Sequence, residues 1–120
     1  MRRLGELEAA VMGVLWSSGE PVTVRQTLTA LDRHPEPAYT TIMTVLDNLH
    51  RKGMVTRERE GRAWAYRPAQ SRTEFDAATM AEVLDASTDR SATLLNFIGK
   101  IDPGELARLR ELLDAAEEQS

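Results

Sequence analysis

A periodic apolar segment that leads directly into two short strand patterns is the feature that most constrains how this chain can fold. Across residues 38–52 the large apolar side chains fall at helical spacing, and Gly53 follows at a position that suits the left-handed end of a helix. Residues 54–60 and 62–67 have strand character, and Gly61 between them suits a tight turn with a positive φ. The sequence therefore predicts a helix followed at once by a β-hairpin.

Two more helices are predicted before this one. Apolar residues recur at helical spacing in residues 5–18 and again after Thr23. Thr23 and Gln26 have the spacing of a capping box, in which each side chain accepts a hydrogen bond from a backbone amide at the start of the helix. The prolines of residues 34–37 indicate a loop. Three short helices and a hairpin in this order are typical of a winged helix-turn-helix.

The second half of the chain is predicted to be helical. The composition changes at residues 68–70, after which Ser71 and Glu74 have the spacing of a second capping box. A break is expected at residues 86–90, and Asp102 followed by a proline marks the start of the last helix.

These elements define a mainly α fold with a small β-hairpin. We expect an N-terminal winged helix-turn-helix DNA-binding domain over residues 1–69 and a C-terminal helical dimerisation domain over residues 70–120. A short helical tail cannot bury all of its large apolar residues alone, so a homodimer is predicted. Its predicted interface consists of Leu94, Phe97, Ile98, Ile101, Leu106, Leu109 and Leu113.

The net charge of −4 disfavours a nucleic-acid partner until the distribution of the charges is considered. Residues 1–68 hold 10 basic and 8 acidic residues, whereas residues 69–120 hold 5 basic and 11 acidic ones. Residues 39–67 alone hold 6 basic and 3 acidic residues. Because the local field governs binding to a polyanion more than the total charge does, residues 39–67 form the candidate DNA-binding region.

The third helix of a winged helix-turn-helix can enter the major groove, where hydroxyl groups bond to phosphates or base edges. The residues predicted to contact double-stranded DNA are Tyr39, Thr40, Thr41, Thr44, Arg51, Lys52, Arg57 and Arg62. Simpler interpretations stay open for several of them: Thr40 and Thr41 as a helix start, Arg51 and Lys52 as a helix cap, Tyr39 as a core residue and Arg57 as a solvated strand residue. Trp64 and Tyr66 are expected to pack rather than to stack on bases. The clustering of these features in one short stretch favours DNA binding.

Other functions find little support in the sequence. The absence of cysteine excludes disulfides and thiolate chemistry, and neither His34 nor His50 has a further ligand at zinc spacing. No serine stands in a nucleophile elbow and no glycine-rich loop could hold a phosphate. We therefore expect no catalytic residue, metal or cofactor, and hence no enzyme. No apolar run approaches the roughly 20 residues of a membrane span, so we expect a cytoplasmic protein without membrane insertion.

Short motifs spread over most of the chain match one known family. They are Leu7-Glu8, Val14-Leu15-Trp16, Thr23-Val24-Arg25, residues 38–46, Arg51-Lys52-Gly53, residues 61–68 and Leu94-Leu95-Asn96-Phe97. Through them the chain, from roughly Leu7 to Leu113, resembles the penicillinase repressor family (BlaI/MecI). The resemblance implies a homodimeric transcriptional repressor that binds a palindromic operator near β-lactam resistance genes or related cell-envelope and stress genes.

The resemblance also implies that repression ends by proteolysis. In the family a membrane sensor triggers cleavage between an Asn and a Phe in the dimerisation region, and Asn96-Phe97 matches that position. A membrane sensor protease is thus an implied partner. The simpler interpretation, that Phe97 is a core residue and Asn96 a polar surface residue, is compatible with this role.

Two departures from the family pattern are visible. Asp47-Asn48 stands where the family often carries a basic residue, which puts one phosphate contact in doubt. The copper-responsive branch ends in a cysteine cluster that this chain lacks, which argues against copper sensing. Two alternatives stay open: a winged-helix repressor released by a small ligand, and a winged-helix protein-interaction module that does not bind DNA.

Overall fold

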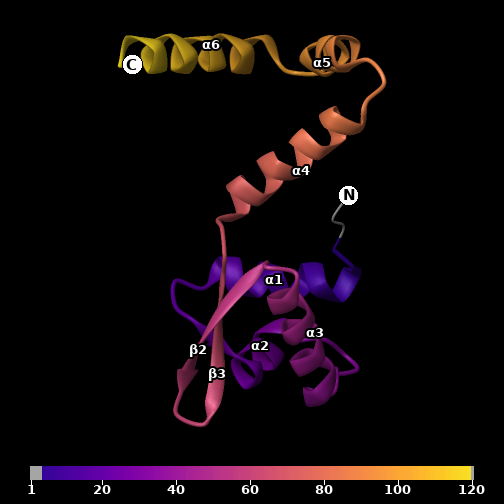
Figure 1. Cartoon of the computed structure of the whole chain (residues 1–120), viewed down its shortest axis with the longest axis vertical. Coiled ribbons are helices and arrows are strands. Elements are labelled where there is room, and N and C mark those ends of the chain that lie inside the picture. The colour runs from indigo at the N-terminus through magenta and orange to yellow at the C-terminus, as the bar shows by residue number, and fades with distance from the viewer. Residues whose placement is uncertain (1–3, 120) are drawn as a thin grey trace. The chain divides into compact units, whose positions relative to one another are not determined.

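The computed structural model describes residues 4–119 and confirms a mainly α fold with a small β-sheet (Figure 1). In chain order the elements are α1 (Glu6–Ser17), β1 (Val22–Thr23), α2 (Val24–Leu31), α3 (Tyr39–Arg51), β2 (Val55–Glu60), β3 (Ala63–Pro68), α4 (Arg72–Ala86), α5 (Arg90–Ile98) and α6 (Pro103–Glu118). The described residues divide between Thr79 and Met80 into two compact units. The first unit holds α1 to β3 and the first part of α4, and the second holds the rest.

The core of the first unit is built around the inner face of α3. Ile42, Leu46 and Leu49 are completely buried, and they belong to one apolar cluster with the buried face of α1 and residues of the sheet. Thr27 of α2 is also fully buried, and its hydroxyl donates a hydrogen bond of 2.8 Å to the carbonyl oxygen of Thr23. The helical spacing of apolar residues therefore identified the faces that meet in the core.

The hairpin of β2 and β3 follows α3 directly, as predicted. Gly53 and Gly61 have φ values of 77° and 63°, a region in which a side chain is strained, so both turns favour glycine. A third strand was not predicted. The two residues of β1 pair antiparallel with β3, with Val22 opposite Tyr66, which gives the strand order β1-β3-β2. A strand this short leaves no alternating pattern in the sequence.

The predicted helix starts are present. Gln26 donates its backbone amide to the Thr23 hydroxyl at 3.2 Å, and its side chain accepts from the Thr23 amide at 2.9 Å. Ser71 and Glu74 form the same reciprocal pair at 3.1 and 3.0 Å. Asp102 accepts a hydrogen bond from the Gly104 amide at the start of α6. These caps satisfy amides that have no partner within the helix.

Two contacts of Trp16 join the start of α4 and the residues before it to the rest of the first unit. The indole nitrogen of Trp16 donates to the carbonyl oxygen of Gln70 at 3.1 Å. The Trp16 and Phe75 rings lie 5.3 Å apart, at a tilted angle that aromatic pairs favour. The winged-helix unit thus extends past the composition change at residues 68–70 to Thr79.

Because Leu46 is fully buried, we expect Leu46→Ala to lower the free energy of unfolding by about 2–5 kcal/mol, through lost apolar burial and the cavity left behind. Urea denaturation followed by circular dichroism measures this loss. Met43→Ala, on the exposed face of the same helix, is the matched control and should change stability by about 0.5 kcal/mol or less. Equal effects of the two variants would contradict the assigned orientation of α3.

Candidate nucleic-acid interface

The outward face of α3 presents a row of hydroxyl groups. Since the inner face of α3 is buried, the side chains of its N-terminal half that point away from the core are exposed: Tyr39, Thr40, Thr41, Met43 and Thr44. The structure therefore brings four of the predicted DNA-contact residues onto one surface. Met43 was not among them, although it follows Tyr39 by four residues and so shares its face of the helix.

Tyr39 is a surface residue and not a core residue, with 42% of its area exposed. The guanidinium of Arg25, from α2, lies 5.2 Å from the centre of the Tyr39 ring. This cation–π contact brings a positive charge from a second helix beside the start of α3. Arg25 was not among the predicted DNA contacts, because nothing local to residue 25 in the sequence indicates which part of α3 it meets.

Arg51 and Arg57 share one carboxylate, that of Asp47. The Asp47 side chain lies 2.7 Å from a guanidinium nitrogen of Arg51, one turn along α3, and 3.6 Å from a guanidinium nitrogen of Arg57 on β2. Two of the predicted DNA-contact residues are therefore held together by an acidic residue between them. In the sequence, Asp47 stands out only as a departure from the family pattern.

The hairpin carries a cluster of arginines around one indole. The guanidinium groups of Arg57 and Arg59 lie 4.3 and 4.4 Å from the centre of the Trp64 ring, which confines both side chains. Arg59 also donates a hydrogen bond of 3.2 Å to the carbonyl oxygen of Arg62, in the exposed turn of the hairpin. Trp64 thus packs within the protein, and Tyr66 is buried.

Lys52, at the end of α3, forms an ion pair with α1. Its ammonium donates a hydrogen bond of 2.8 Å to Glu8 of α1, whose other carboxylate oxygen accepts from the Gly5 amide at 3.0 Å. The Lys52 hydrogen bond, and next the Gly5 amide, lower the pKa of Glu8 below its ordinary value of 4.5. This contact gives Lys52 a structural role at the end of α3.

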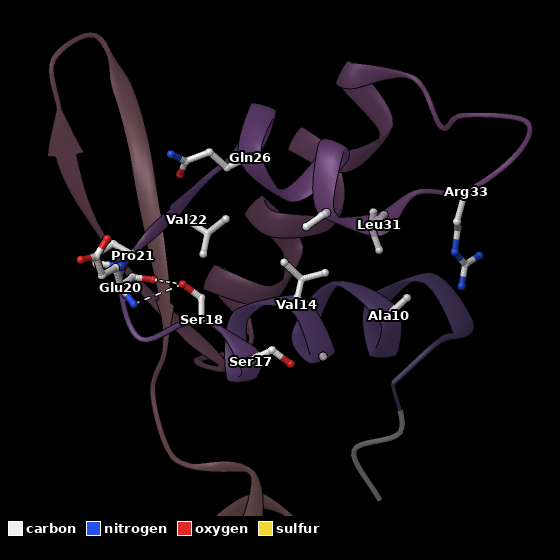
Figure 2. Close-up of a pocket in the computed structure, with 12 residues that line it drawn as sticks. Ala10, Val14, Ser17, Ser18, Glu20, Pro21, Val22, Gln26, Leu31 and Arg33 are labelled. Carbon is white, nitrogen blue, oxygen red and sulfur yellow. Dashed lines mark hydrogen bonds between the residues drawn. The ribbon is translucent and has the colours of Figure 1, made fainter.

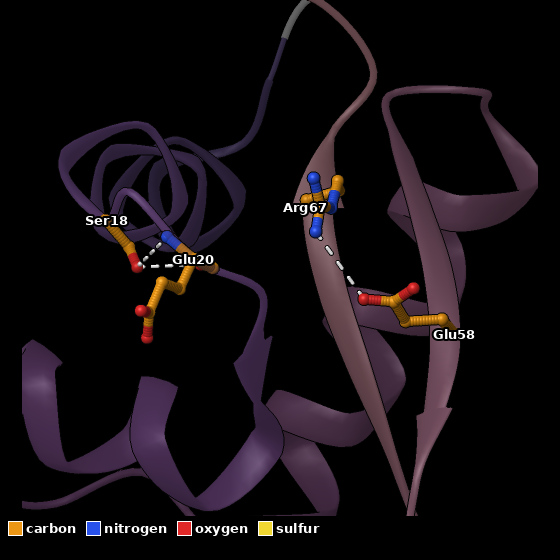
Figure 3. Close-up of polar contacts among 4 residues, drawn as sticks. All are labelled: Ser18, Glu20, Glu58 and Arg67. Atoms are coloured by element: carbon orange, nitrogen blue, oxygen red, sulfur yellow. Dashed lines mark hydrogen bonds and ion pairs between the residues drawn. The ribbon is translucent and has the colours of Figure 1, made fainter.

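Two other polar contacts of the first unit lie on the hairpin and in the loop after α1 (Figure 3). Arg67 of β3 lies 3.5 Å from Glu58 of β2, and both side chains are exposed. In the loop after α1, the Ser18 hydroxyl donates to the Glu20 carbonyl oxygen at 2.7 Å and accepts from the Glu20 amide at 3.2 Å. Glu58 is thus one more acidic residue that offsets a basic one on the hairpin.

An open groove of about 730 Å³ lies between α1 and α2 (Figure 2). Ala10, Val14 and Leu31 contribute apolar side chains to its lining, and Gln26 and Arg33 contribute polar ones. Among residues 4–119, no buried side-chain nitrogen or oxygen lacks a hydrogen-bond partner. The groove therefore contains no buried polar group that a ligand would be needed to satisfy.

The second unit leaves most of its large apolar side chains exposed. None of the residues of α4, α5 or α6 is buried. Of the predicted interface residues, Leu94, Phe97, Ile98, Leu109 and Leu113 are exposed, while Leu106 and Ile101, between α5 and α6, are half-buried. The exposed set also contains Met80, Val83, Leu95 and Leu112, which were not predicted.

Asn96 and Phe97 lie in the last turn of α5, and both are exposed. The Asn96 side chain donates a hydrogen bond of 2.9 Å to the carbonyl oxygen of Ala92, one turn earlier. Phe97 is thus not a core residue of the single chain.

Neither a metal centre nor a membrane helix emerges from the part of the chain that the structure describes. Across residues 4–119, no three His, Asp or Glu side chains lie close enough together to hold a metal ion. Every helix within the same limits is too short or too polar to cross a bilayer.

Three helices, a three-stranded sheet and an arginine-rich hairpin beside an exposed α3 define a winged-helix DNA-binding protein. The profile of the family described as Penicillinase repressor matches residues 4–115. The chain belongs to the penicillinase repressor family, and it is a transcriptional repressor of the BlaI type and not an enzyme. Two relatives, each named Transcriptional regulator BlaI, come from Mycobacterium tuberculosis strains CDC 1551/Oshkosh and H37Rv. Each is 42% identical over 116 residues, which cover 94% of this chain and 84% of the relative.

Solved structures agree on the fold. The DNA-binding domain of the repressor BlaI, solved in solution, is 25% identical, with a TM-score of 0.52 over 62% of this chain and 93% of that one. The crystal structure of MepR, a transcription regulator of the Staphylococcus aureus multidrug efflux pump MepA, has a TM-score of 0.52 at 15% identity over 97% of this chain and 79% of that one. A complex of S. aureus MepR with DNA has a TM-score of 0.51 at 17% identity over 82% of each chain.

The Glu8–Lys52 contact makes stability depend on pH. Because the pKa of Glu8 is lower in the folded protein, the contact contributes stability above the ordinary value of 4.5, and this contribution is lost as the pH falls through the folded pKa. We expect Glu8→Gln to lower the free energy of unfolding by about 1 kcal/mol at neutral pH. The difference from wild type should shrink when the pH is lowered from neutral to well below 4.5, through the folded pKa of Glu8.

Urea denaturation at both pH values measures this effect. Glu6→Gln on the same helix is the control, since the Glu6 side chain is 90% exposed and lies 3.7 Å from Arg33. A difference between Glu8→Gln and wild type that persisted unchanged in acid would show that the ion pair is not its cause.

Proposed function

We propose that this repressor acts as a homodimer that binds the two halves of a palindromic operator. The observation that carries the proposal is that the chain has two features at once. The N-terminal half of α3 exposes a hydroxyl-rich face, and the second unit leaves most of its large apolar residues exposed in the single chain. A two-fold dimer presents two identical recognition helices, which suits an inverted repeat. The relatives named as BlaI regulators and the MepR–DNA complex support binding to double-stranded DNA.

The N-terminal half of α3 is assigned to the major groove. Thr40, Thr41 and Thr44 carry hydroxyl and methyl groups that can meet phosphates, base edges and the thymine methyl. Tyr39, beside Arg25, suits a phosphate or sugar contact at the edge of the groove. These residues would select the sequence.

The basic residues are assigned to the DNA backbone. Arg62 stands in the exposed turn of the hairpin, and Arg51 at the end of α3 has a side chain that is 73% exposed. Arg57 is more confined, between Asp47 and Trp64. Lys52 contributes to the local positive field but remains paired with Glu8. These residues would position the protein without reading bases.

Thr44 and Arg62 should differ in what they do for DNA binding. Arg62→Ala should weaken binding to all sequences and make the slope of log K against log salt shallower by about 1. Thr44→Ala should instead change the sequences recovered when the protein selects duplexes from a random pool. Fluorescence anisotropy over a salt series, combined with sequencing of the selected pools, measures both effects.

Arg110→Ala in α6 removes the same charge from the second unit and is the control for net charge. A Thr44→Ala protein with unchanged selected sequence and affinity would remove Thr44 from the recognition surface. Equal salt slopes for Arg62→Ala and Arg110→Ala would show that Arg62 does not contact the DNA backbone.

The dimer interface is assigned to the second unit. Its exposed apolar side chains include Leu95 at 69% and Leu113 at 66%, values that are costly to leave in water on a small protein. The predicted set therefore gains Met80, Val83, Leu95 and Leu112. The acidic balance of residues 69–120 would also keep this unit away from the phosphates.

Release from DNA is assigned to cleavage of the Asn96–Phe97 bond by a protease that a membrane sensor activates. Both residues are exposed in the last turn of α5, where a helix opens locally at low cost. Cleavage there would separate α6 and the end of α5 from the DNA-binding unit. Genes for β-lactam resistance, or related cell-envelope and stress genes, are the targets that the family name favours.

A chain truncated after Asn96 tests dimerisation and release together. The full chain should sediment as a dimer at micromolar concentration, whereas residues 1–96 should sediment as a monomer. The fragment should bind a palindromic duplex roughly 10²–10⁴-fold more weakly, because the second half-site no longer binds at high effective concentration. A full-length Leu95→Asp/Leu113→Asp variant should reproduce both changes if lost apolar contact is their cause. A fragment that dimerised and bound like the full chain would exclude cleavage here as the switch.

A further inference from the structure

We propose that Asp47 is a specificity-determining residue that acts by positioning Arg51 and Arg57, and thereby limits binding to unmatched DNA. The inference rests on the proposed role of α3 and the hairpin in DNA binding. Asp47 is itself on α3, at a position where a carboxylate would be expected to weaken attraction to a polyanion. We therefore look for its role in the two arginines with which it forms ion pairs, Arg51 and Arg57.

The geometry of Asp47 divides its two oxygens between two elements. One oxygen lies 2.7 Å from Arg51, four residues further along α3, and the other lies 3.6 Å from Arg57 on β2. Arg57 is in turn stacked over Trp64 of β3. A chain of contacts from Asp47 through Arg57 to Trp64 thus links the recognition helix to both strands of the hairpin.

The three side chains differ in their freedom. The exposed fraction is 73% for Arg51, 39% for Asp47 and 26% for Arg57. Arg57 is confined by both its ion pair and the indole, whereas Arg51 is restrained chiefly by Asp47. Without the carboxylate, Arg51 would be a long flexible cation able to reach many phosphate positions.

This restraint affects matched and unmatched DNA differently. Binding to unmatched DNA depends almost entirely on phosphate contacts that the side chains collect by adjusting to the duplex. A guanidinium fixed by Asp47 adjusts less, and its charge is partly neutralised. On a matched duplex, α3 binds the groove in a single orientation. Arginines that are already fixed in position then lose little conformational entropy on binding. Asp47 thus reduces nonspecific affinity more than specific affinity.

The test compares Asp47→Asn with wild type in the full chain. Binding is measured to poly(dI-dC) and to the duplex that wild type selects from a random pool, between low and moderate salt. We expect Asp47→Asn to bind poly(dI-dC) about fivefold more tightly at low salt and with a salt slope steeper by about 1. Its affinity for the selected duplex should change by less than about twofold, so the specificity ratio falls.

Glu20→Gln is the matched control, because it removes one carboxylate from the exposed loop between α1 and β1 (Figure 3), and this carboxylate, unlike that of Asp47, forms no ion pair with Arg51 or Arg57. The same Asp47→Asn change is also made in an Arg51→Ala/Arg57→Ala background. If Asp47 acts through the two arginines, the change in that background should have no more effect than Glu20→Gln. A full effect there would mean that Asp47 repels phosphates directly, and would overturn the proposal.

Two further results would also overturn it. Asp47→Asn could match Glu20→Gln on poly(dI-dC), or it could lose affinity only for the selected duplex, which would make Asp47 a base-reading residue. A wild-type protein that selects no sequence would instead contradict the proposed role of α3. Circular dichroism of each variant establishes that it is folded, so a binding change is not a folding change.

Discussion

The packing of the inner face of α3 is the interaction on which the rest of the structure depends. Ile42, Leu46 and Leu49 are completely buried, and no side chain on that face can turn outward without loss of the core. Because a helix presents its residues at fixed angles, burial of this face also fixes which residues face solvent. The packing of the core therefore also determines the direction in which the hydroxyl groups of α3 point.

Carboxylates moderate the positive surface that this packing creates. Lys52 is bound by Glu8, Arg67 lies beside Glu58, and Asp47 lies between two arginines. A count of basic residues over 39–67 thus overstates the charge available to DNA. It is the placement of each pair that decides which cations can reach a phosphate, since a paired cation must first exchange partners.

Local patterns in the sequence were sufficient for the helices, their caps and the turns of the hairpin. The capping residue Thr23 and the glycines Gly53 and Gly61 each act within a few residues of their own position, so the sequence alone identifies them. Two of the missed features depend on distant partners: β1 exists only through β3, and the Lys52–Glu8 contact joins residues far apart in the chain. In α4 to α6 no residue is buried in the single chain, so burial does not identify which apolar residues meet a partner.

The difference in burial between the two units is the last consequence of the same physics. The first unit buries a core of apolar residues between its own helices and sheet. The second unit lacks a buried residue in any helix, so its stability depends on what covers it. Under the proposed function, that cover is the second copy of the chain, and dimerisation stabilises the unit as it forms. On the same proposal, loss of part of α5 and α6 would weaken operator binding by separating the two DNA-binding units, without any change to the recognition surface itself.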